Sequence, residues 1–340
     1  MSVSERKFGV LQTGETVKIF HLENKSGAYA EVTDFGAILV KVCVPDKDGT
    51  LTDVVLGYDD LASYEVNGCF FGSTIGRNGN RIGGAKFSVN GKEVVLAQNE
   101  NDNNLHSGPD GFEKKLWKVA EISDDKNSVI FNRISPDGEN GFPGEFDVSV
   151  KYEFTEDNEL RIHYQGICDE PTVANMTNHS YFNLNGEGSG TAMDQYLTIH
   201  AKYYTPVADS HSIPTGVYEE VAGTPMDFRT AKQIGQDIEA EFDQLKFTGG
   251  YDHNYVTDNY AKGNRRPHTV IKPELPWMSL LTVHVYSFTQ QILSKMNMVK
   301  MVILTISGML SVWKRRLNRM RSMLKISTPR FLMQVNSMIL

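Results

Sequence analysis

Hydrophobic and polar residues alternate in short runs along roughly the first 270 residues, a pattern typical of β-strands. The runs are rich in Val, Ile, Phe, Tyr and Thr, and clusters of turn-forming residues separate them. The pattern predicts strands at 29–45 (YAEVTDFGAILVKVCVP), 128–134 (SVIFNRI), 145–155 (EFDVSVKYEFT), 159–168 (ELRIHYQGIC) and 196–207 (YLTIHAKYYTPV). No fixed-period repeat is present, which disfavours a solenoid or a propeller. We therefore expect one domain over residues 1–340, with an all-β fold built as a large antiparallel β-sandwich.

Two local signals add detail to this prediction. Asn90 and Gly91 both tolerate positive φ, so they suit the tight turn of a hairpin whose arms are Lys86–Val89 and Lys92–Leu96. The stretch Thr230–Leu245 (TAKQIGQDIEAEFDQL) is predicted to be a helix, with Thr230 placed to cap its first turn.

Composition changes abruptly near Pro273. The whole chain has 34 Lys and Arg, 42 Asp and Glu, and a formal net charge of -8. Nine of these bases and none of the acids lie in 275–340, so this tail carries +9 and the preceding residues carry -17. Seven of the nine bases fall in Ser311–Arg330 (SVWKRRLNRMRSMLKISTPR). Two different compositions are therefore joined in one chain.

Targeting and partner signals are few. The N-terminal MSVSERKFGV is polar, and no run reaches the roughly 18 to 20 apolar residues that a spanning helix needs. We therefore expect a cytoplasmic protein with no membrane partner, either a monomer or a weak homodimer. The basic Ser311–Arg330 segment lacks a clean apolar face and has few aromatics, which disfavours a nucleic-acid or membrane-surface role.

Two glycine- and asparagine-rich stretches carry candidate binding residues. GSTIGRNGNRIGGAKF contains Asn80 and Arg81 but fits neither a phosphate loop nor a dinucleotide fingerprint. Its glycines free the backbone to approach a ligand, and its Arg and Asn donors suit hydroxyl groups. The alternative is a plain turn with a surface arginine. His106, in NENDNNLHSGPDGF, is either functional or a solvated loop histidine.

Two further stretches hold titratable groups among apolar residues. His179 lies in PTVANMTNHSYFNLNGEG, where it is either a hydrogen-bonded core group or a general acid with a pKa tuned toward neutrality. Asp252 lies between Tyr251 and Tyr255 in GGYDHNYV, where rings could cover the CH faces of a sugar while the carboxylate accepts from its hydroxyls. A turn-forming role for this aspartate is equally consistent with the pattern. No HxH, HExxH or GxSxG motif is present, so neither a metal nor a serine nucleophile is indicated.

The order and separation of the motifs GRNGNRI, NLHSG, TNHSYFNL, PMDFR and GYDHNY closely resemble the aldose 1-epimerase (galactose mutarotase) family. The resemblance spans about Thr13–Arg266 and includes TDFGAIL and GFPG. It implies a galactose mutarotase-like supersandwich with no cofactor. The implied partner is a small-molecule monosaccharide, and the implied activity interconverts the α and β anomers of free hexoses such as galactose and glucose.

The same resemblance implies a role for individual residues. His179 would be the general acid that protonates the ring oxygen of the sugar. Arg81 and His106 would bind the ring-oxygen side and the neighbouring hydroxyls, and Asn80 would assist them. Asp252 would hold sugar hydroxyls, and Tyr181, in the same motif as His179, is a further substrate-binding candidate.

The resemblance also implies a catalytic base, a Glu near the C-terminus in a segment that reads approximately L-E-T-Q followed by P-D. No Glu follows Glu274 in this chain. Reading the third base of each codon with the first two of the next gives GAA, for Glu, at Trp313–Lys314, because Trp is TGG and Lys begins with AA. In the same frame, VYSFTQQI accommodates the family-like V-Q-F-Y-T-A-N.

These matches favour the interpretation that the chain is read out of frame from a point between Pro267 and Leu275. Residues 275–340 would then be an aberrant tail, and the domain would lose late strands and one wall of its site. The alternative is a catalytically impaired relative that binds sugar or regulates without the glutamate.

Overall fold

A computed structural model describes residues 2–46 and 48–257, together with the backbone of five short strands between residues 269 and 335. The basic segment Ser311–Arg330, including the Trp313–Lys314 junction, lies outside the described residues.

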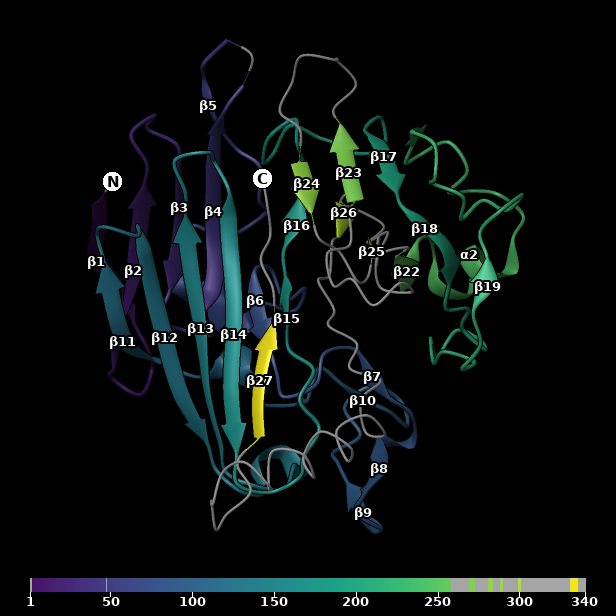
Figure 1. The fold of residues 1–340 in the computed structure, drawn as a ribbon, viewed down its shortest axis with the longest axis horizontal. Coiled ribbons are helices and arrows are strands. Elements are labelled where there is room, and N and C mark those ends of the chain that lie inside the picture. The colour runs from purple at the N-terminus through teal and green to yellow at the C-terminus, as the bar shows by residue number, and fades with distance from the viewer. Residues whose placement is uncertain are drawn as a thin grey trace, which may run out of the picture.

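Two five-stranded antiparallel sheets form the main body (Figure 1). The first sheet follows chain order: β1 (Ser2–Val10), β2 (Thr16–Glu23), β3 (Tyr29–Thr33), β4 (Ile38–Pro45) and β5 (Leu51–Asp53). The second comprises β11 (Lys118–Ser123), β12 (Ser128–Ser135), β13 (Phe146–Phe154), β14 (Leu160–Cys168) and β27 (Phe331–Val335). The predicted all-β antiparallel sandwich is thus confirmed.

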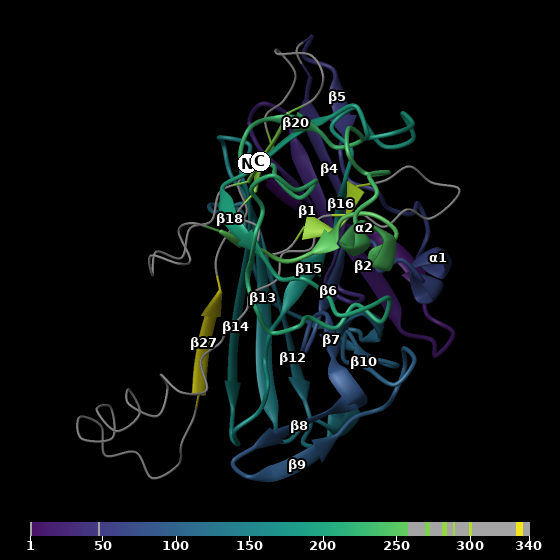
Figure 2. The same cartoon turned by 90° about the vertical axis from the view of Figure 1, so that its right-hand side faces the viewer.

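The two sheets lie over one another, as the perpendicular view also shows (Figure 2), and buried residues of both belong to one core cluster. Along β13 buried residues alternate with more exposed ones, because successive side chains of a strand point to opposite faces of the sheet. Phe20 of β2 meets Phe131 of β12 with ring centroids 5.4 Å apart, and the hydroxyl of Tyr152 in β13 donates to Ala37 O at 2.7 Å. The sheets are therefore joined by both apolar and polar contacts.

Shorter antiparallel sheets surround one end and one side of the sandwich. Three are two-stranded: β6 (Ser73–Ile75) with β15 (Thr177–His179), β7 (Arg81–Ile82) with β10 (Asn104–Leu105), and β8 (Lys86–Val89) with β9 (Lys92–Val95). Two are four-stranded and have the orders β16 (Tyr181–Phe182), β26 (Val299–Lys300), β25 (Phe288–Thr289), β21 (Asp252–His253) and β20 (Lys232–Gln233), β17 (Tyr196–Ile199), β23 (Thr269–Lys272), β24 (Leu281–Val283). One is three-stranded, with the order β19 (Glu219–Glu220), β18 (Ala201–Tyr204), β22 (Tyr255–Thr257).

Helices are few in the described part of the chain. They are α1 (Leu61–Val66), α2 (Asp243–Thr248) and three single turns of 3₁₀-helix at Gly83–Ala85, Phe112–Lys114 and Glu139–Gly141. Neither α-helix is long and apolar enough to cross a membrane.

The predicted strands are confirmed, with two refinements. The 29–45 stretch divides into β3 and β4, and the 196–207 stretch divides into β17 and β18. The predicted hairpin is also confirmed, with Asn90 at φ 50° and Gly91 at φ 77° in its turn. Its second arm ends at Val95, one residue earlier than predicted.

The predicted helix at Thr230–Leu245 is wrong. Ile234 N donates to Gln195 O at 2.9 Å and Gly235 N donates to Met193 O at 2.8 Å, so these amides are committed to a neighbouring segment. A Cβ at Gly235 would lie 2.9 Å from Met193 Cβ, which shows how closely the two backbones approach. Tertiary hydrogen bonds therefore replace the helical ones, and a helix forms only at Asp243–Thr248.

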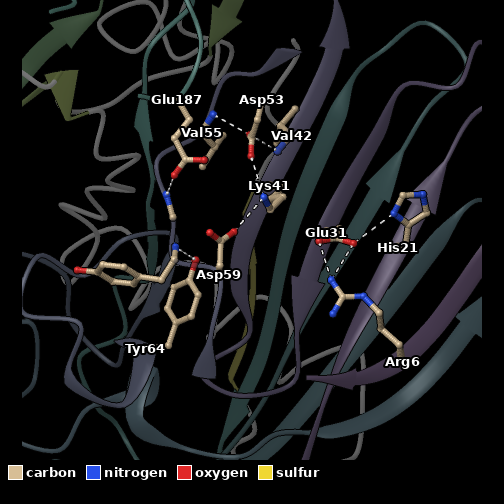
Figure 3. A network of polar contacts seen from close by, with 12 residues as sticks. Arg6, His21, Glu31, Lys41, Val42, Asp53, Val55, Asp59, Tyr64 and Glu187 are labelled. Carbon is tan, nitrogen blue, oxygen red and sulfur yellow. Dashed lines mark hydrogen bonds and ion pairs between the residues drawn. The ribbon is translucent and has the colours of Figure 1, made fainter. Parts of the chain in front are cut away.

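Two polar clusters lie on the first sheet (Figure 3). In one, Glu31 accepts from Arg6 at 3.2 Å and contacts His21 at 3.4 Å. In the other, Asp53 Oδ1 accepts the backbone N–H groups of Val42 and Val55, each at 3.1 Å. Burial raises the pKa of Asp53 to about 6. The second cluster therefore ties β4 to β5 through a side chain as well as through the strand ladder.

Candidate active site

His106 and His179, which are 73 positions apart in the sequence, lie side by side in the fold. Their rings meet edge to face, with centroids 5.1 Å apart and an interplanar angle of 85°. His106 is 4% exposed and His179 is 1% exposed. The interpretation of His106 as a solvated loop residue is therefore wrong, and two buried imidazoles share one site.

The backbone on both sides of His179 is fixed. His179 ends β15, where it pairs with Ser73 of β6, and its carbonyl accepts from Gly72 N at 3.2 Å. Gly72 has a φ of 64°, and a Cβ at this position would collide with the carbonyl oxygen of Leu39. Only glycine satisfies both demands, so the Gly72 position helps to set where the His179 ring stands.

A buried polar network lies beneath this strand. Asn178 Nδ2 donates to Gly72 O at 2.9 Å and to the hydroxyl of Tyr152 at 3.3 Å. Ser180 Oγ donates to Asn178 Oδ1 at 2.5 Å. Burial raises the pKa of Tyr152, which keeps its hydroxyl protonated as a donor to Ala37 O. The residues on either side of His179 are thus held by neutral hydrogen bonds.

A short ladder between β7 and β10 joins Asn80 and Arg81 to His106. His106 N donates to Asn80 O at 3.1 Å, and Asn80 N donates to His106 Nδ1 at 2.9 Å. A ring nitrogen that accepts a hydrogen bond carries no proton, so neutral His106 holds its proton on Nε2. The geometry gives His106 a donor at Nε2.

Arg81 is held by an acid that sequence reasoning missed. Its guanidinium makes two parallel hydrogen bonds to Glu100, Nε to Oε2 at 2.5 Å and Nη2 to Oε1 at 2.7 Å, and Nη1 lies 3.4 Å from Asn80 Oδ1. Arg81 is 14% exposed, so the alternative of a surface arginine is wrong. A bidentate pair fixes the plane of the guanidinium as well as its position.

Arg77, in the same glycine-rich stretch, has a structural role. It is 2% exposed and donates to six oxygens, which belong to Ser135 (Oγ and O), Pro136 (O), Pro143 (O), Gly144 (O) and Thr172 (Oγ1). Four of these acceptors are backbone carbonyls. Arg77 therefore joins the GFPG turn to the site segment and has no donor left for a ligand.

The aromatics beside Asp252 do not frame a ligand. The hydroxyls of Tyr251 and Tyr255 donate to Pro225 O at 3.1 Å and to Met226 O at 3.0 Å, and both residues are almost fully buried. The interpretation of these rings as covers for a sugar is therefore wrong; they anchor the strand to the core.

Asp252 itself remains partly exposed. Its neighbour His253 is 2% exposed, and burial lowers the pKa of this histidine to about 4. Because alternate residues of a strand face opposite ways, the burial of Tyr251 and His253 directs Asp252 to the other side.

Tyr181 lies beside His179, on the same four-stranded sheet as Asp252. Its ring lies 5.5 Å from that of His179 and 5.1 Å from that of Phe71. Burial raises the pKa of Tyr181, and the nearby charge of Asp252 adds to this effect. Asp252 and Tyr181 lie on the two outer strands of one four-stranded sheet, with β25 and β26 between them. Tyr181 is 1% exposed, so its ring acts as a wall behind His179.

Phe70 also belongs to this site, and no sequence signal pointed to it. Its ring centroid lies 4.9 Å from that of His106 and 5.5 Å from that of His179. In the sequence, CFFG resembles an ordinary apolar run, and only the fold separates its two phenylalanines.

The chain belongs to the aldose 1-epimerase family. The family model described as Aldose 1-epimerase matches residues 18–284. The aldose 1-epimerase of Escherichia coli (strain K12) is 38% identical over 251 residues, which cover 74% of this chain and 70% of the relative. The galactose mutarotase of Bos taurus is 40% identical over 256 residues, covering 75% and 72% respectively.

Solved structures share this fold. An aldose epimerase homologue from C. elegans matches with a TM-score of 0.74 at 26% identity and covers 85% of this chain and 89% of its own. The galactose 1-epimerase from Lactobacillus acidophilus NCFM matches the fold with a TM-score of 0.78 at 24% identity, over 100% of this chain and 98% of its own.

Proposed function

We propose that this protein is built to interconvert the α and β anomers of free hexoses such as galactose and glucose, with His179 as the general acid. The observation that carries the proposal is the meeting of the His106 and His179 rings at 5.1 Å, with Asn80 N–H bonded to His106 and the Arg81 guanidinium 3.4 Å from Asn80 Oδ1. A proton donor and a cluster of hydroxyl-binding donors are the groups that the opening of a cyclic sugar requires.

The proposed reaction has two proton transfers. His179 protonates the ring oxygen while a base removes the proton of the C1 hydroxyl, and the bond between C1 and the ring oxygen breaks to leave the open aldehyde. Rotation about the C1–C2 bond followed by the reverse transfers gives the other anomer. Each positioned proton-transfer group contributes about 10²- to 10⁴-fold in rate, so acid and base are both needed.

The remaining residues bind and orient the sugar in this proposal. His106 donates from Nε2, because its Nδ1 is occupied by Asn80 N–H. Arg81, with Asn80 at its side, donates to the ring-oxygen side of the sugar, and Asp252 accepts from sugar hydroxyls. Tyr181 contributes a wall behind His179. The proposed partner is a monosaccharide, and we expect a cytoplasmic monomer or weak homodimer, which light scattering of the purified protein checks for assembly.

The base is the incomplete part of this machinery. No Glu follows Glu274, and the shifted frame restores one at Trp313–Lys314. We therefore propose that a single insertion or deletion near the codons for residues 267–275 separates this chain from a complete epimerase. The absent glutamate favours a second candidate function for the chain as written, which is sugar binding with little turnover.

Two experiments test these proposals. Sequencing the encoding DNA tests the frame: intact codons from 267 to 275 would exclude the shift. Polarimetry of freshly dissolved α-galactose tests the function, using the chain as written and a frame-restored version. We expect the frame-restored protein to exceed the chain as written by about 10²- to 10⁴-fold in the rate of rotation change. A frame-restored protein no faster than buffer would exclude the epimerase function.

A further inference from the structure

Phe70 is the most exposed of the three rings that meet at the site. Its ring contacts both imidazoles, at 4.9 Å from His106 and 5.5 Å from His179, and it is partly exposed whereas the two histidines are 4% and 1% exposed. Any ligand that approaches both imidazoles must therefore pass close to this ring.

The backbone of Phe70 has an unusual conformation. Its φ is 57°, in the left-handed region that bulky side chains rarely adopt. Such conformations cost free energy, persist only where the surroundings fix them, and cluster at functional sites.

Neighbouring residues impose this conformation. Asn67, which is 3% exposed, accepts Phe71 N at its Oδ1 at 2.8 Å and donates from Nδ2 to Phe71 O at 3.2 Å. Phe70 N donates to Asn67 O at 3.0 Å, and Ser73 N donates to Phe70 O at 3.1 Å. Phe71 is 5% exposed and packs on Tyr181, so the loop directs one phenylalanine into the core and the other toward the histidines.

The other aromatics near the site are committed elsewhere. Tyr251 and Tyr255 anchor their strand through hydroxyls bonded to the 225–226 backbone, and Tyr181 is 1% exposed. Among the aromatics described at the site, Phe70 is thus the partly exposed ring in contact with both imidazoles.

We propose that Phe70 is the apolar platform of the sugar site, on which the CH face of the pyranose packs while the hydroxyls and the ring oxygen face the imidazoles. This inference rests on the proposed function. Sites that bind small polar ligands combine an apolar lining with a few placed polar groups, and the electron-rich face of an aromatic ring suits the slightly positive hydrogens of a sugar CH face. The strained backbone of Phe70 holds such a platform in place before the ligand arrives.

The test measures galactose binding by the full chain in two ways, by titration calorimetry and by the proton NMR shifts of the bound sugar. Phe70→Ala is expected to raise Kd about tenfold, whereas Phe70→Tyr, which keeps the ring, stays within about threefold. The ring-current displacement of the sugar CH protons should be present with the wild type and lost in Phe70→Ala. Phe87→Ala is the matched control. Phe87 lies on the β8–β9 hairpin, is also partly exposed, and packs on another phenylalanine, Phe142.

The outcomes separate the two proposals. Absence of sugar binding by the full chain overturns this inference and the second candidate function, sugar binding, whereas the epimerase function is decided separately by polarimetry of the frame-restored protein. A wild type that binds sugar, together with a Phe70→Ala that keeps the same Kd and the same proton shifts, overturns the platform alone. A higher Kd for Phe70→Ala, with no ring-current displacement of the sugar protons in the wild type, also overturns the platform. The ring would then act only by positioning the histidines. If Phe70→Ala does not fold, Phe70→Leu, which keeps apolar volume without a ring, decides the question by the same two measurements.

Discussion

The backbone N–H of Asn80 donates to Nδ1 of His106 at 2.9 Å, and this single contact assigns the proton of the neutral imidazole to Nε2. It also separates the two histidines by role. His106 is tied into a backbone ladder that suits a fixed donor, whereas His179 stands at the end of β15 against the rings of Phe70, His106 and Tyr181.

Substitution of each histidine should therefore affect a different kinetic constant. In the frame-restored protein we expect His179→Gln to lower kcat by about 10²- to 10⁴-fold with a small change in KM. His106→Gln should mainly raise KM. Polarimetric progress curves at several galactose concentrations measure both constants, and a His106→Gln variant that loses kcat as severely as His179→Gln would contradict the division of roles.

Glu100 should act through Arg81. Glu100→Gln removes the charge that clamps the guanidinium, so we expect galactose to bind about 3- to 10-fold more weakly while the fold is unchanged. Glu93→Gln is the control, because Glu93 makes a long, exposed pair with Lys86 at 3.7 Å. Calorimetric titration with galactose compares the two variants. Equal affinities would show that Glu100 does not contribute to sugar binding.

Arg77 should govern stability rather than binding. Arg77→Met removes the donor of four backbone carbonyls, of which those of Ser135 and Gly144 are in buried contacts, and this should lower the free energy of unfolding by about 3–5 kcal/mol. Arg229→Met, which breaks an exposed pair with Asp227, should cost less than about 1 kcal/mol. Urea unfolding followed by circular dichroism measures both, and near-wild-type stability of Arg77→Met would show that the turn holds without it.

Glu113 should make stability fall as pH rises. It is 3% exposed, and burial raises the pKa of its carboxyl from 4.5 to about 7. The folded state therefore binds this proton more tightly than the unfolded state. The resulting stability is complete below pH 4.5 and is lost as pH rises through about 7, by about 3 kcal/mol in total.

Glu113→Gln should abolish that loss, because the amide has no proton to release. Melting temperatures at pH 4.5 and pH 8 test this expectation, with exposed Glu121→Gln as the control. The prediction fails if Glu113→Gln and the wild type lose the same stability between the two pH values.

The tail should limit the stability of the chain as written. If residues 275–340 are out of frame, edges and apolar faces of the sandwich lose the partners that the family sequence would supply. We expect broad, weakly cooperative melting that sharpens in the frame-restored protein. A sharp transition of the chain as written, at a temperature ordinary for a domain of this size, is the contrary result.

Much of the fold could be predicted because the long strands bury one face. Along β13 and β14 buried and more exposed residues alternate, because successive side chains of a strand point to opposite faces of the sheet. The alternation of apolar and polar residues in the sequence therefore indicates which face is buried. Over Thr230–Leu245 the sequence predicts a helix instead, and this prediction is wrong. There the amides of Ile234 and Gly235 bond to the 193–195 backbone, an arrangement that no local pattern encodes.

The site could be predicted in part, for a similar reason. His106, His179, Arg81 and Asp252 lie in motifs whose order is informative, although spacing alone could not bring the two histidines together. Phe70 was hidden because its importance comes from a left-handed φ, which is imposed by hydrogen bonds to Asn67.

The hydrogen bonds that attach Arg77 to the rest of the molecule depend little on the identity of the neighbouring side chains. Four of its six acceptors are main-chain oxygens, which every relative with the same turn also possesses. We therefore expect the stretch 67–81 to keep its conformation when it replaces the equivalent segment of a relative in the same family. This stretch contains Asn67, Phe70, Gly72, Arg77 and Arg81. It can therefore be exchanged as one segment between relatives to build chimaeras, and the exchanged segment would carry its own loop conformation, its anchor and the groups that we propose to face the sugar.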